Sequence, residues 1–358
     1  MVTSHVFPNS LSPDTTVVID VGGRYGPHPT WKTFDGTLLY VIFEPDIHEA
    51  NRLAQCLKTA NSITCRRVYI ERCAIGNKDG KINLNFSTNR AMSTSLNRIL
   101  VDPAISNRSV TTGGSESDSA TSQEVTVERL DTWVTKAPAL STRVDFLKID
   151  TEGTELEVLQ GATKQLDHGV LGVRCEVTFA KVYDEHLTGT FRSVSAFLEE
   201  KDFFLLNLDY HGQGHRYSNF VRADSRYGVL VDCDAVFCSS WQRLLSLHVN
   251  NNHFEQALSV LKYVTFLFNN NAADLALYCL ANEYSVAALS AARNQLEEVP
   301  LYRYTRNICQ HHFYKLKWDP SQFVPDHQNF FGRVFGTELK TGTAYNEDVD
   351  LNPFFLCA

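Results

Sequence analysis

Several carboxylates and glycines in this chain stand directly after apolar runs, where open α/β sheets bind their ligands. The run that starts at Val144 ends in Asp150, and a helical pattern begins a few residues later. A β-branched run at residues 17–19 leads into Asp20 and then into a glycine-rich turn. Because ligands bind outside the carboxyl ends of strands in such sheets, these positions predict an active site.

The glycine-rich turn and the acid after the next apolar run predict an adenosine-containing cofactor. Gly22 and Gly26 suit positive φ angles and close approach of a ligand. Glu44 follows 22 residues after Gly22, a spacing that suits a carboxylate bound to the two ribose hydroxyls. The Gly-x-Gly-x-x-Gly spacing of a dinucleotide site is absent. Asp20 favours a cofactor with a positive centre and an amino group, such as S-adenosylmethionine, over a pyrophosphate.

One helix is expected after the strand that ends at residue 150. Thr151 and Thr154 are both candidate N-caps. Lys148 is expected to pair with Glu152 or Glu155. The apolar face of this helix would consist of Leu156, Leu159, Ala162 and Leu166.

Another helix should begin after Asp46, which can cap it. Its apolar positions are Ile47, Ala50, Leu53, Ala54 and Leu57.

Four motifs, in this order, resemble the FkbM family of S-adenosylmethionine-dependent O-methyltransferases over roughly residues 15–240. They are Asp20–Gly26, Phe43–Asp46, Cys73–Gly80, and Glu128–Asp131 followed by Phe146–Glu155. The resemblance implies an α/β fold: a seven-stranded, mostly parallel, Rossmann-like class I methyltransferase sheet with helices on both faces. It also implies methyl transfer to a hydroxyl, often of a sugar or a complex natural product. Gly23 stands where many relatives carry Ala, a difference we expect to be harmless.

The resemblance also implies a set of cofactor-binding residues. Gly22, Tyr25 and Gly26 would frame the methionine end, and Glu44 would hold the ribose. Cys73 and Ala74 would present backbone groups near the adenine. The full expected set is Asp20, Gly22, Tyr25, Gly26, Glu44, Pro45, Cys73, Ala74 and Asp150.

Methyl transfer to an alcohol calls for a base or a metal, because a hydroxyl is a poor nucleophile. Asp150 is the first candidate for this role, and Glu176 lies at the end of an adjacent predicted strand. The two carboxylates could bind a divalent cation such as Mg²⁺ or hydrogen-bond the acceptor directly. His211, in a glycine-flanked loop that also holds His215, is a further candidate base.

Composition narrows the function classes. The chain has 358 residues and a formal net charge of −8, without a sustained basic stripe, so nucleic acid is not expected as a partner. Nine cysteines without a Cys-x-x-Cys pair indicate reduced thiols. Neither a signal peptide nor an apolar run long enough for a membrane span is evident. We therefore expect a cytoplasmic enzyme that acts on a small molecule or a glycan.

We expect three parts: an arm at residues 1–14, the methyltransferase domain at 15–240 and a helical, irregular extension at 241–358. A Ser/Thr-rich stretch, Thr111–Ser122, predicts a lid or plain disorder. A partly buried, alternating strand is expected at 229–238. Helical patterns at Phe254–Leu261 and Asp274–Arg293, broken at 269–271, suggest an antiparallel pair that packs on the domain, closes its site or forms a homodimer.

Two other functions stay open on sequence alone. A nicotinamide-dependent oxidoreductase would share the sheet, although the glycine spacing argues against it. A catalytically silent binding module could use the C-terminal helices, although the joint presence of Asp20, Glu44 and Asp150 argues against it. The acceptor could be a sugar hydroxyl, a polyketide- or peptide-derived hydroxyl, or a lipid-linked glycan.

Overall fold

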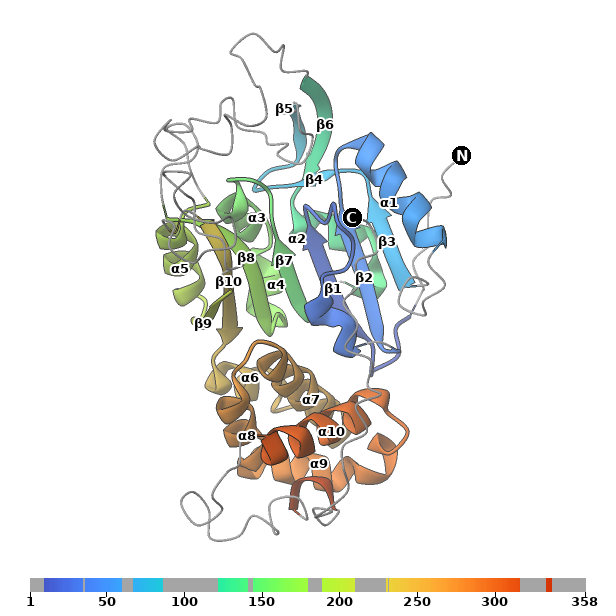
Figure 1. Ribbon diagram of the computed structural model, residues 1–358, viewed down its shortest axis with the longest axis vertical. Coiled ribbons are helices and arrows are strands. Elements are labelled where there is room, and N and C mark those ends of the chain that lie inside the picture. Colours follow the sequence, from blue (N-terminus) through green and yellow to red (C-terminus); the bar gives the residue numbers. More distant parts are fainter. Residues whose placement is uncertain are drawn as a thin grey trace, which may run out of the picture.

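A seven-stranded sheet forms the centre of the protein (Figure 1). The structure, a computed structural model, describes residues 10–34, 36–59, 67–85, 122–140, 144–179, 189–209, 230, 232–315 and 333–336. The strand order is β3-β2-β1-β7-β8-β10-β9. The bounds are β1 (Thr16–Val21), β2 (Leu38–Phe43), β3 (Val68–Glu71), β7 (Phe146–Ile149), β8 (Gly172–Thr178), β9 (Phe203–Asp209) and β10 (Asp232–Ser239).

Strand β10 runs antiparallel to both of its neighbours, β8 and β9, whereas the other pairs in this sheet are parallel. The expected seven-stranded, mostly parallel sheet is therefore confirmed. The alternating, partly buried pattern expected for residues 229–238 is wrong, because Cys233–Ser239 are buried throughout. Strand β10 lies between two strands and is covered on both faces, so its side chains meet other side chains on either side.

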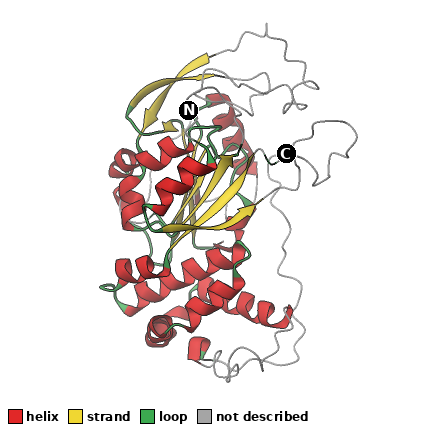
Figure 2. Ribbon diagram, turned by 90° about the vertical axis from the view of Figure 1, so that its left-hand side faces the viewer, coloured by secondary structure: helices red, strands yellow, loops and turns green. Residues whose placement is uncertain are grey.

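Helices cover both faces of the sheet, as expected (Figure 2). One face, which includes Val18, Tyr40 and Phe146, packs against η1 (Pro29–Phe34), α1 (Ile47–Thr59) and the C-terminal helices. The opposite face packs against α2 (Leu130–Trp133), α3 (Glu155–Gly161), α4 (Thr163–His168) and α5 (Phe191–Glu199). Short turns η4 (Val134–Lys136) and η5 (Pro138–Leu140) follow α2.

The two predicted helix starts differ in outcome. Asp46 caps α1 as expected, because its Oδ1 accepts a hydrogen bond from the His48 amide at 2.9 Å. The helix after residue 150 is instead two helices, α3 and α4, separated at Ala162. Thr154 occupies the N-cap position of α3 without a side-chain capping bond. The amides in this turn bond to the carboxylate of Glu155, so the threonine caps were wrong.

A second, three-stranded sheet was not predicted. It has the order β4-β6-β5, with β4 (Ala74–Ile75), β5 (Gly80–Asn85) and β6 (Ser122–Glu128). Its longer strands alternate apolar and polar residues, with Ile82 and Leu84 in β5 and Val125 and Val127 in β6, a pattern that the sequence analysis did not use. The Ser/Thr-rich stretch lies outside the described residues except for Ser122, where β6 begins.

Five helices, not the expected pair, follow the sheet in the described part of the C-terminal region. They are α6 (Trp241–His248), α7 (His253–Asn269), α8 (Ala273–Ala281), α9 (Glu283–Leu296) and α10 (Pro300–Lys315). The break at residues 269–271 is confirmed, since α7 ends there and Asn271 has a φ of 61°. The expected single helix at 274–293 is wrong because Asn282 ends α8 and caps α9, its Oδ1 accepting from the Tyr284 amide at 3.0 Å.

Helix α7 joins these helices to the amino ends of the parallel strands. Lys262 donates to the carbonyl oxygen of Thr15 at 2.7 Å and contacts both carboxylate oxygens of Asp145 at 2.9 Å. Phe266 stacks on Phe146, at the start of β7, with ring centroids 4.9 Å apart. The helices thus pack on the sheet, as one of the expectations held. They lie at the edge opposite the carboxyl ends of β7 and β8, so the described helices do not close a site there.

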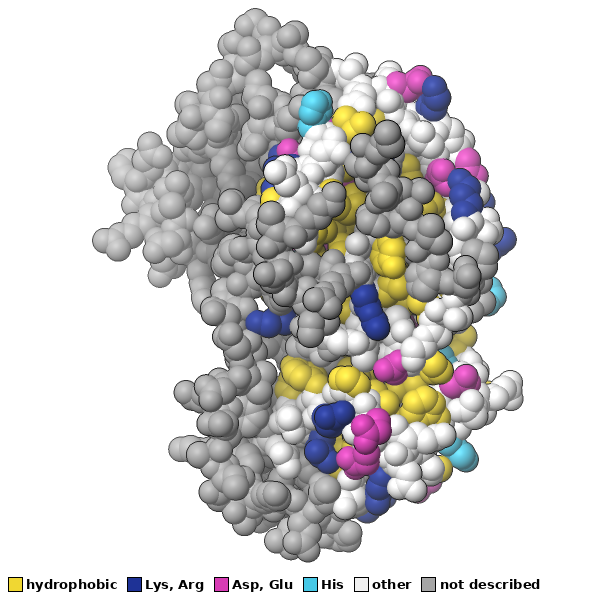
Figure 3. Space-filling view, turned by 90° about the vertical axis from the view of Figure 1, so that its right-hand side faces the viewer, with side chains coloured by type: hydrophobic (Ala, Val, Ile, Leu, Met, Phe, Trp, Pro, Cys, Tyr) yellow, Lys and Arg dark blue, Asp and Glu magenta, His cyan; other side chains and the backbone are white. Residues whose placement is uncertain are grey.

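The described cysteines agree with the expected reduced thiols. None of the described helices is long and apolar enough to cross a membrane. The described cysteines are all free thiols, and all but Cys56 are buried. On the face seen in Figure 3, coloured acidic and basic side chains stand interspersed, without a continuous basic patch among them.

Candidate functional site

The glycine turn after β1 packs directly against the end of β7. Gly22 has a φ of +84°, and a Cβ built on it would lie 1.8 Å from the carbonyl oxygen of Asp150. Gly26 has a φ of +82°. Only glycine fits position 22, because both the φ angle and the close approach exclude a side chain.

Gly23 also has no room for a side chain. A Cβ at this position would lie 2.8 Å from Cγ2 of Ile42 and 2.9 Å from Oδ2 of Asp20. An alanine would require these neighbours to shift. Glycine at position 23 is therefore matched by tight packing in this chain.

Asp20 lies beneath this turn and is fully buried. Tyr40 donates to its Oδ2, and the ammonium of Lys148 lies 3.5 Å from its Oδ1. Burial raises the pKa of Asp20, which Lys148 and Tyr40 partly oppose. Asp20 thus supports the turn from below; its contact with the cofactor stays a prediction.

Glu44 stands beside the glycine turn, at the end of β2. The amide of Gly22 donates to the carbonyl of Phe43 at 3.0 Å, which brings the turn next to this acid. The Glu44 carboxylate accepts from the Asp46 amide at 2.8 Å, across the Pro45 turn. Burial raises the pKa of Glu44 to about 7. The residues predicted to hold the methionine and ribose parts of a cofactor therefore adjoin one another.

Cys73 and Ala74 follow β3 at the same edge of the sheet. The Glu44 amide donates to the carbonyl of Glu71 at 3.0 Å, which places the chain after β3 beside the β2 end. Burial raises the pKa of Cys73 to about 12, so its thiol is not a nucleophile. Tyr25, by contrast, is 66% exposed in the turn.

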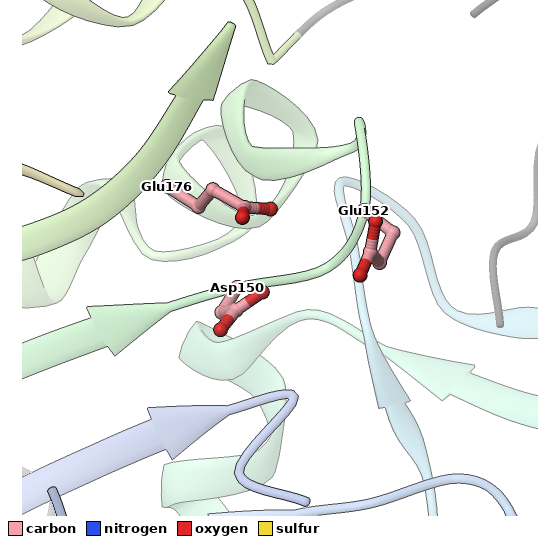
Figure 4. Close-up of side chains that lie close together, drawn as sticks. All are labelled: Asp150, Glu152 and Glu176. Atoms are coloured by element: carbon pink, nitrogen blue, oxygen red, sulfur yellow. The ribbon is translucent and has the colours of Figure 1, made fainter. Parts of the chain in front are cut away.

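Asp150 and Glu176 converge, as their places at adjacent strand ends predicted. Strands β7 and β8 are parallel with Ile149 opposite Cys175, so the next residue of each strand is an acid. Glu152, which the sequence analysis named only as an expected partner of Lys148, joins them. One carboxylate oxygen from each of the three residues lies within 4.8 Å of the others. Figure 4 shows the three side chains turned toward a common space.

Asp150, Glu152 and Glu176, called the carboxylate cluster below, concentrate negative charge in a small space. Burial raises the pKa of Glu176 well above its usual value, and the negative charges of Asp150 and Glu152 raise it further. A group in such surroundings is stabilised by a proton or by a cation. The cluster can therefore take a proton from an acceptor hydroxyl or offer hard oxygen ligands to a divalent ion.

Lys148 pairs with Asp150 and Asp20, so its expected pairing with Glu152 or Glu155 was wrong. Its ammonium lies 3.2 Å from Oδ2 of Asp150. Alternate residues of a strand share one face, which puts Lys148 and Asp150 side by side. Burial alone would lower the pKa of Lys148, but the two carboxylates outweigh it and raise that pKa, so the ammonium stays charged.

Arg174, also missed by the sequence analysis, extends the row of buried charges across β8. It lies opposite Lys148 in the register of β7 and β8. It bonds to Oδ2 of Asp234 at 2.9 Å and to Asp209. Burial, Arg174 and Lys148 together lower the pKa of His28 to about 3, which keeps that imidazole neutral. The candidate base His211 lies outside the described residues, as does His215.

Comparisons with known proteins identify the family of this chain. The model of the methyltransferase FkbM domain matches residues 20–210, which is more than half of the chain. A crystal structure of methyltransferase FkbM from Methylobacillus flagellatus KT is 14% identical, with a TM-score of 0.35 over 66% of this chain. The chain spans 45% of the length of that protein. A comparison with curated proteins gives no match. By its domain match, the chain belongs to the FkbM family of S-adenosylmethionine-dependent methyltransferases.

Proposed function

We propose that this methyltransferase transfers its methyl group to a hydroxyl of a sugar or of a complex natural product. The observation that carries the proposal is the carboxylate cluster at the carboxyl ends of β7 and β8. Three carboxylates beside the glycine turn provide what an alcohol acceptor needs, namely a proton acceptor and a means of orientation. An amine or a thiol has less need of such a set.

In this proposal the cofactor lies over the glycine turn. Gly22, Tyr25 and Gly26 frame its methionine end, and Glu44 accepts hydrogen bonds from the ribose hydroxyls. Cys73 and Ala74 offer backbone groups near the adenine, and Pro45 shapes the turn between them. When bound, the cofactor supplies a methyl group on a sulfonium, which an oxygen attacks in line. Direct packing of Gly22 on the Asp150 backbone supports this placement, because it brings the glycine turn next to the carboxylate cluster.

Asp150 and Glu176 would orient the acceptor hydroxyl and take its proton. A positioned base of this kind typically contributes about 10²–10⁴-fold to the rate. Lys148 holds one oxygen of Asp150, which fixes the direction of the carboxylate. His211 is a second candidate base for the same proton.

We further propose that the cluster holds a divalent cation, most naturally Mg²⁺. The donor set fits: three carboxylate oxygens lie within 4.8 Å of one another, and hard cations prefer such ligands. A cation there would lower the pKa of a coordinated hydroxyl. The raised pKa of Glu176, caused by burial and by like charges, supports this role because a cation would relieve it.

Methyl transfer from tritiated S-adenosylmethionine tests the acceptor class. A panel of glycosides and a small-molecule extract would serve as acceptors. We expect the label in a product that resists mild alkali and releases iodomethane with hydriodic acid, as a methyl ether does. Asp150→Asn should lower transfer at least about 100-fold, whereas Glu157→Gln, on the next helix, should not. Label on nitrogen or sulfur, or full transfer by Asp150→Asn, would contradict the proposal.

A further inference from the structure

The turn between Asp150 and α3 holds Glu152 in an unusual backbone conformation. Glu152 has a φ of 57°, in the left-handed region that favours glycine, and Gly153 follows with a φ of 109°. A glutamate takes this conformation only where the surrounding structure enforces it. In an extended or right-handed conformation the side chain would leave from a different direction. The conformation is thus tied to the place of Glu152 in the carboxylate cluster.

The side chain that enforces the turn belongs to Glu155, which is 1% exposed. Its Oε1 accepts hydrogen bonds from the amides of Thr151 and Gly153, both at 3.0 Å, and from the Thr151 hydroxyl at 3.1 Å. These amides lie on either side of Glu152. Oε1 of Glu155 therefore binds the amide on each side of Glu152.

The second oxygen of Glu155 is enclosed by a separate segment. A Cβ on Gly189 would lie 1.7 Å from Oε2, so only glycine leaves space for this carboxyl group. The Gly189 amide also donates to the carbonyl of Gly153 at 3.1 Å. Glu155 is thus held between the turn and the segment that leads into α5.

We propose that Glu155 is a positioning residue, which fixes the turn so that Glu152 completes the carboxylate cluster with Asp150 and Glu176. This inference rests on the proposed function of that cluster. It assigns different tasks to the two glutamates of one short segment. Glu152 is a ligand or a proton acceptor, whereas Glu155 acts through its hydrogen bonds to residues 151–153.

Substitutions of Glu155 separate its shape from its charge. Glu155→Gln keeps an oxygen that accepts from both amides, and burial already raises the pKa of Glu155 to about 7, so a neutral side chain is a close substitute. Glu155→Leu removes the acceptor and leaves both amides without it. Glu157→Gln, in the same helix turn, is the control for a lost charge. Glu155→Asp shortens the side chain and serves if the leucine variant does not fold.

Mn²⁺ binding measures the integrity of the carboxylate cluster without a methyl acceptor. It is monitored as the loss of the paramagnetic resonance signal of the free ion. We expect Glu155→Leu, or Glu155→Asp in its place, to weaken Mn²⁺ binding at least about 10-fold, as changes behind metal ligands typically do. Glu155→Gln and Glu157→Gln should stay within about 3-fold of the wild-type protein. Amide hydrogen exchange at Thr151 and Gly153 should accelerate in Glu155→Leu, or in Glu155→Asp in its place, but not in Glu155→Gln or Glu157→Gln.

The outcomes separate this inference from the proposed function. If the wild-type protein binds Mn²⁺ and folded Glu155→Leu binds it equally well, the positioning role is overturned and the metal site stands. If Glu155→Gln loses Mn²⁺ as fully as Glu155→Leu, the charge matters and not the bonds to the turn, which also overturns the role. If the wild-type protein takes up no Mn²⁺, the proposed metal site fails, and hydrogen exchange decides the positioning role: exchange at Thr151 and Gly153 that is as slow in Glu155→Leu as in the wild-type protein overturns it.

Discussion

Asp150 connects the two halves of the candidate site. Its backbone carbonyl touches Gly22 of the glycine turn, and its carboxylate meets Glu152 and Glu176 on one side and Lys148 on the other. A single residue therefore sets the distance between the predicted cofactor position and the predicted acceptor position. Methyl transfer depends on that distance, because the acceptor oxygen must reach the methyl group in line.

Lys148 should be essential for stability because it neutralises buried Asp20. Lys148→Met leaves that carboxylate without its cation, which should lower the free energy of unfolding by about 3–5 kcal/mol near neutral pH. Asp20→Asn combined with Lys148→Met should recover most of the loss, since position 20 then carries no charge. Urea denaturation measures both.

The control for this experiment is Lys81→Met, at an exposed ion pair with Glu124. It should change the free energy of unfolding by no more than about 0.5 kcal/mol. A Lys148→Met protein as stable as the control would show that Asp20 does not depend on this ammonium.

Cofactor affinity should depend on pH through Glu44. Burial raises the pKa of this carboxyl to about 7, so it is mostly protonated below that pH and mostly ionised above it. The ionised form accepts hydrogen bonds from both ribose hydroxyls, so the Kd for S-adenosylmethionine should fall about tenfold between about pH 6 and about pH 8. Calorimetry across this range measures it. In Glu44→Gln, which does not titrate, the profile should be flat; an unchanged slope would assign the effect to another group.

At the residue scale, sequence patterns identified single side chains better than their partners. Asp150 and Glu176 were predicted together because parallel strands end at one edge. Lys148 was paired with the wrong acids, although strand periodicity places it beside Asp150. Glu152 was missed because only a left-handed turn brings it back toward the strand ends, and the sequence does not reveal that turn.

At the scale of elements, the strands were predictable and the helix ends were less so. The apolar runs of β1, β2 and β7 are buried on both faces, which makes them easy to recognise. The apolar positions of α3 and α4 continue one helical pattern, so periodicity did not reveal the break at Ala162. Asn282 ends one helix and caps the next within a single residue, and the pattern around it stays helical.

Helix α7 should contribute strongly to stability through Lys262. This side chain is almost fully buried and binds Asp145, whose Oδ2 also accepts from the Val17 amide at 2.7 Å. Lys262→Met leaves the partly buried carboxylate of Asp145 without its cation, which should cost about 3–5 kcal/mol of unfolding free energy. Urea denaturation followed by tryptophan fluorescence and by circular dichroism measures it, with Lys81→Met again as the control.

The same experiment tests whether the helices and the sheet unfold together. The two probes should give one coincident transition, because α7 and the sheet share a continuous apolar core. Two separate transitions, with only the first shifted by Lys262→Met, would show that the helices fold as a unit of their own. The expected boundary near residue 240 would then correspond to a domain boundary.

At the scale of the whole molecule, the candidate site and the C-terminal helices lie at opposite edges of one sheet. The carboxyl ends of the parallel strands carry the glycine turn, Glu44 and the carboxylate cluster, whereas the C-terminal helices pack at the amino ends. Local patterns indicated the first edge, because its residues are grouped in motifs. They did not indicate the second, because Lys262 and Asp145 are 117 residues apart and meet only in the folded chain.

The central claim is that the edge with the glycine turn binds S-adenosylmethionine next to a site for a hydroxyl acceptor. Calorimetric titration with S-adenosylmethionine, with NAD as the control ligand, tests it most directly. We predict saturable binding of S-adenosylmethionine, loss of that binding in Glu44→Ala, and no binding of NAD. Binding that survives in Glu44→Ala, or binding of NAD in place of S-adenosylmethionine, would contradict the assignment of this edge.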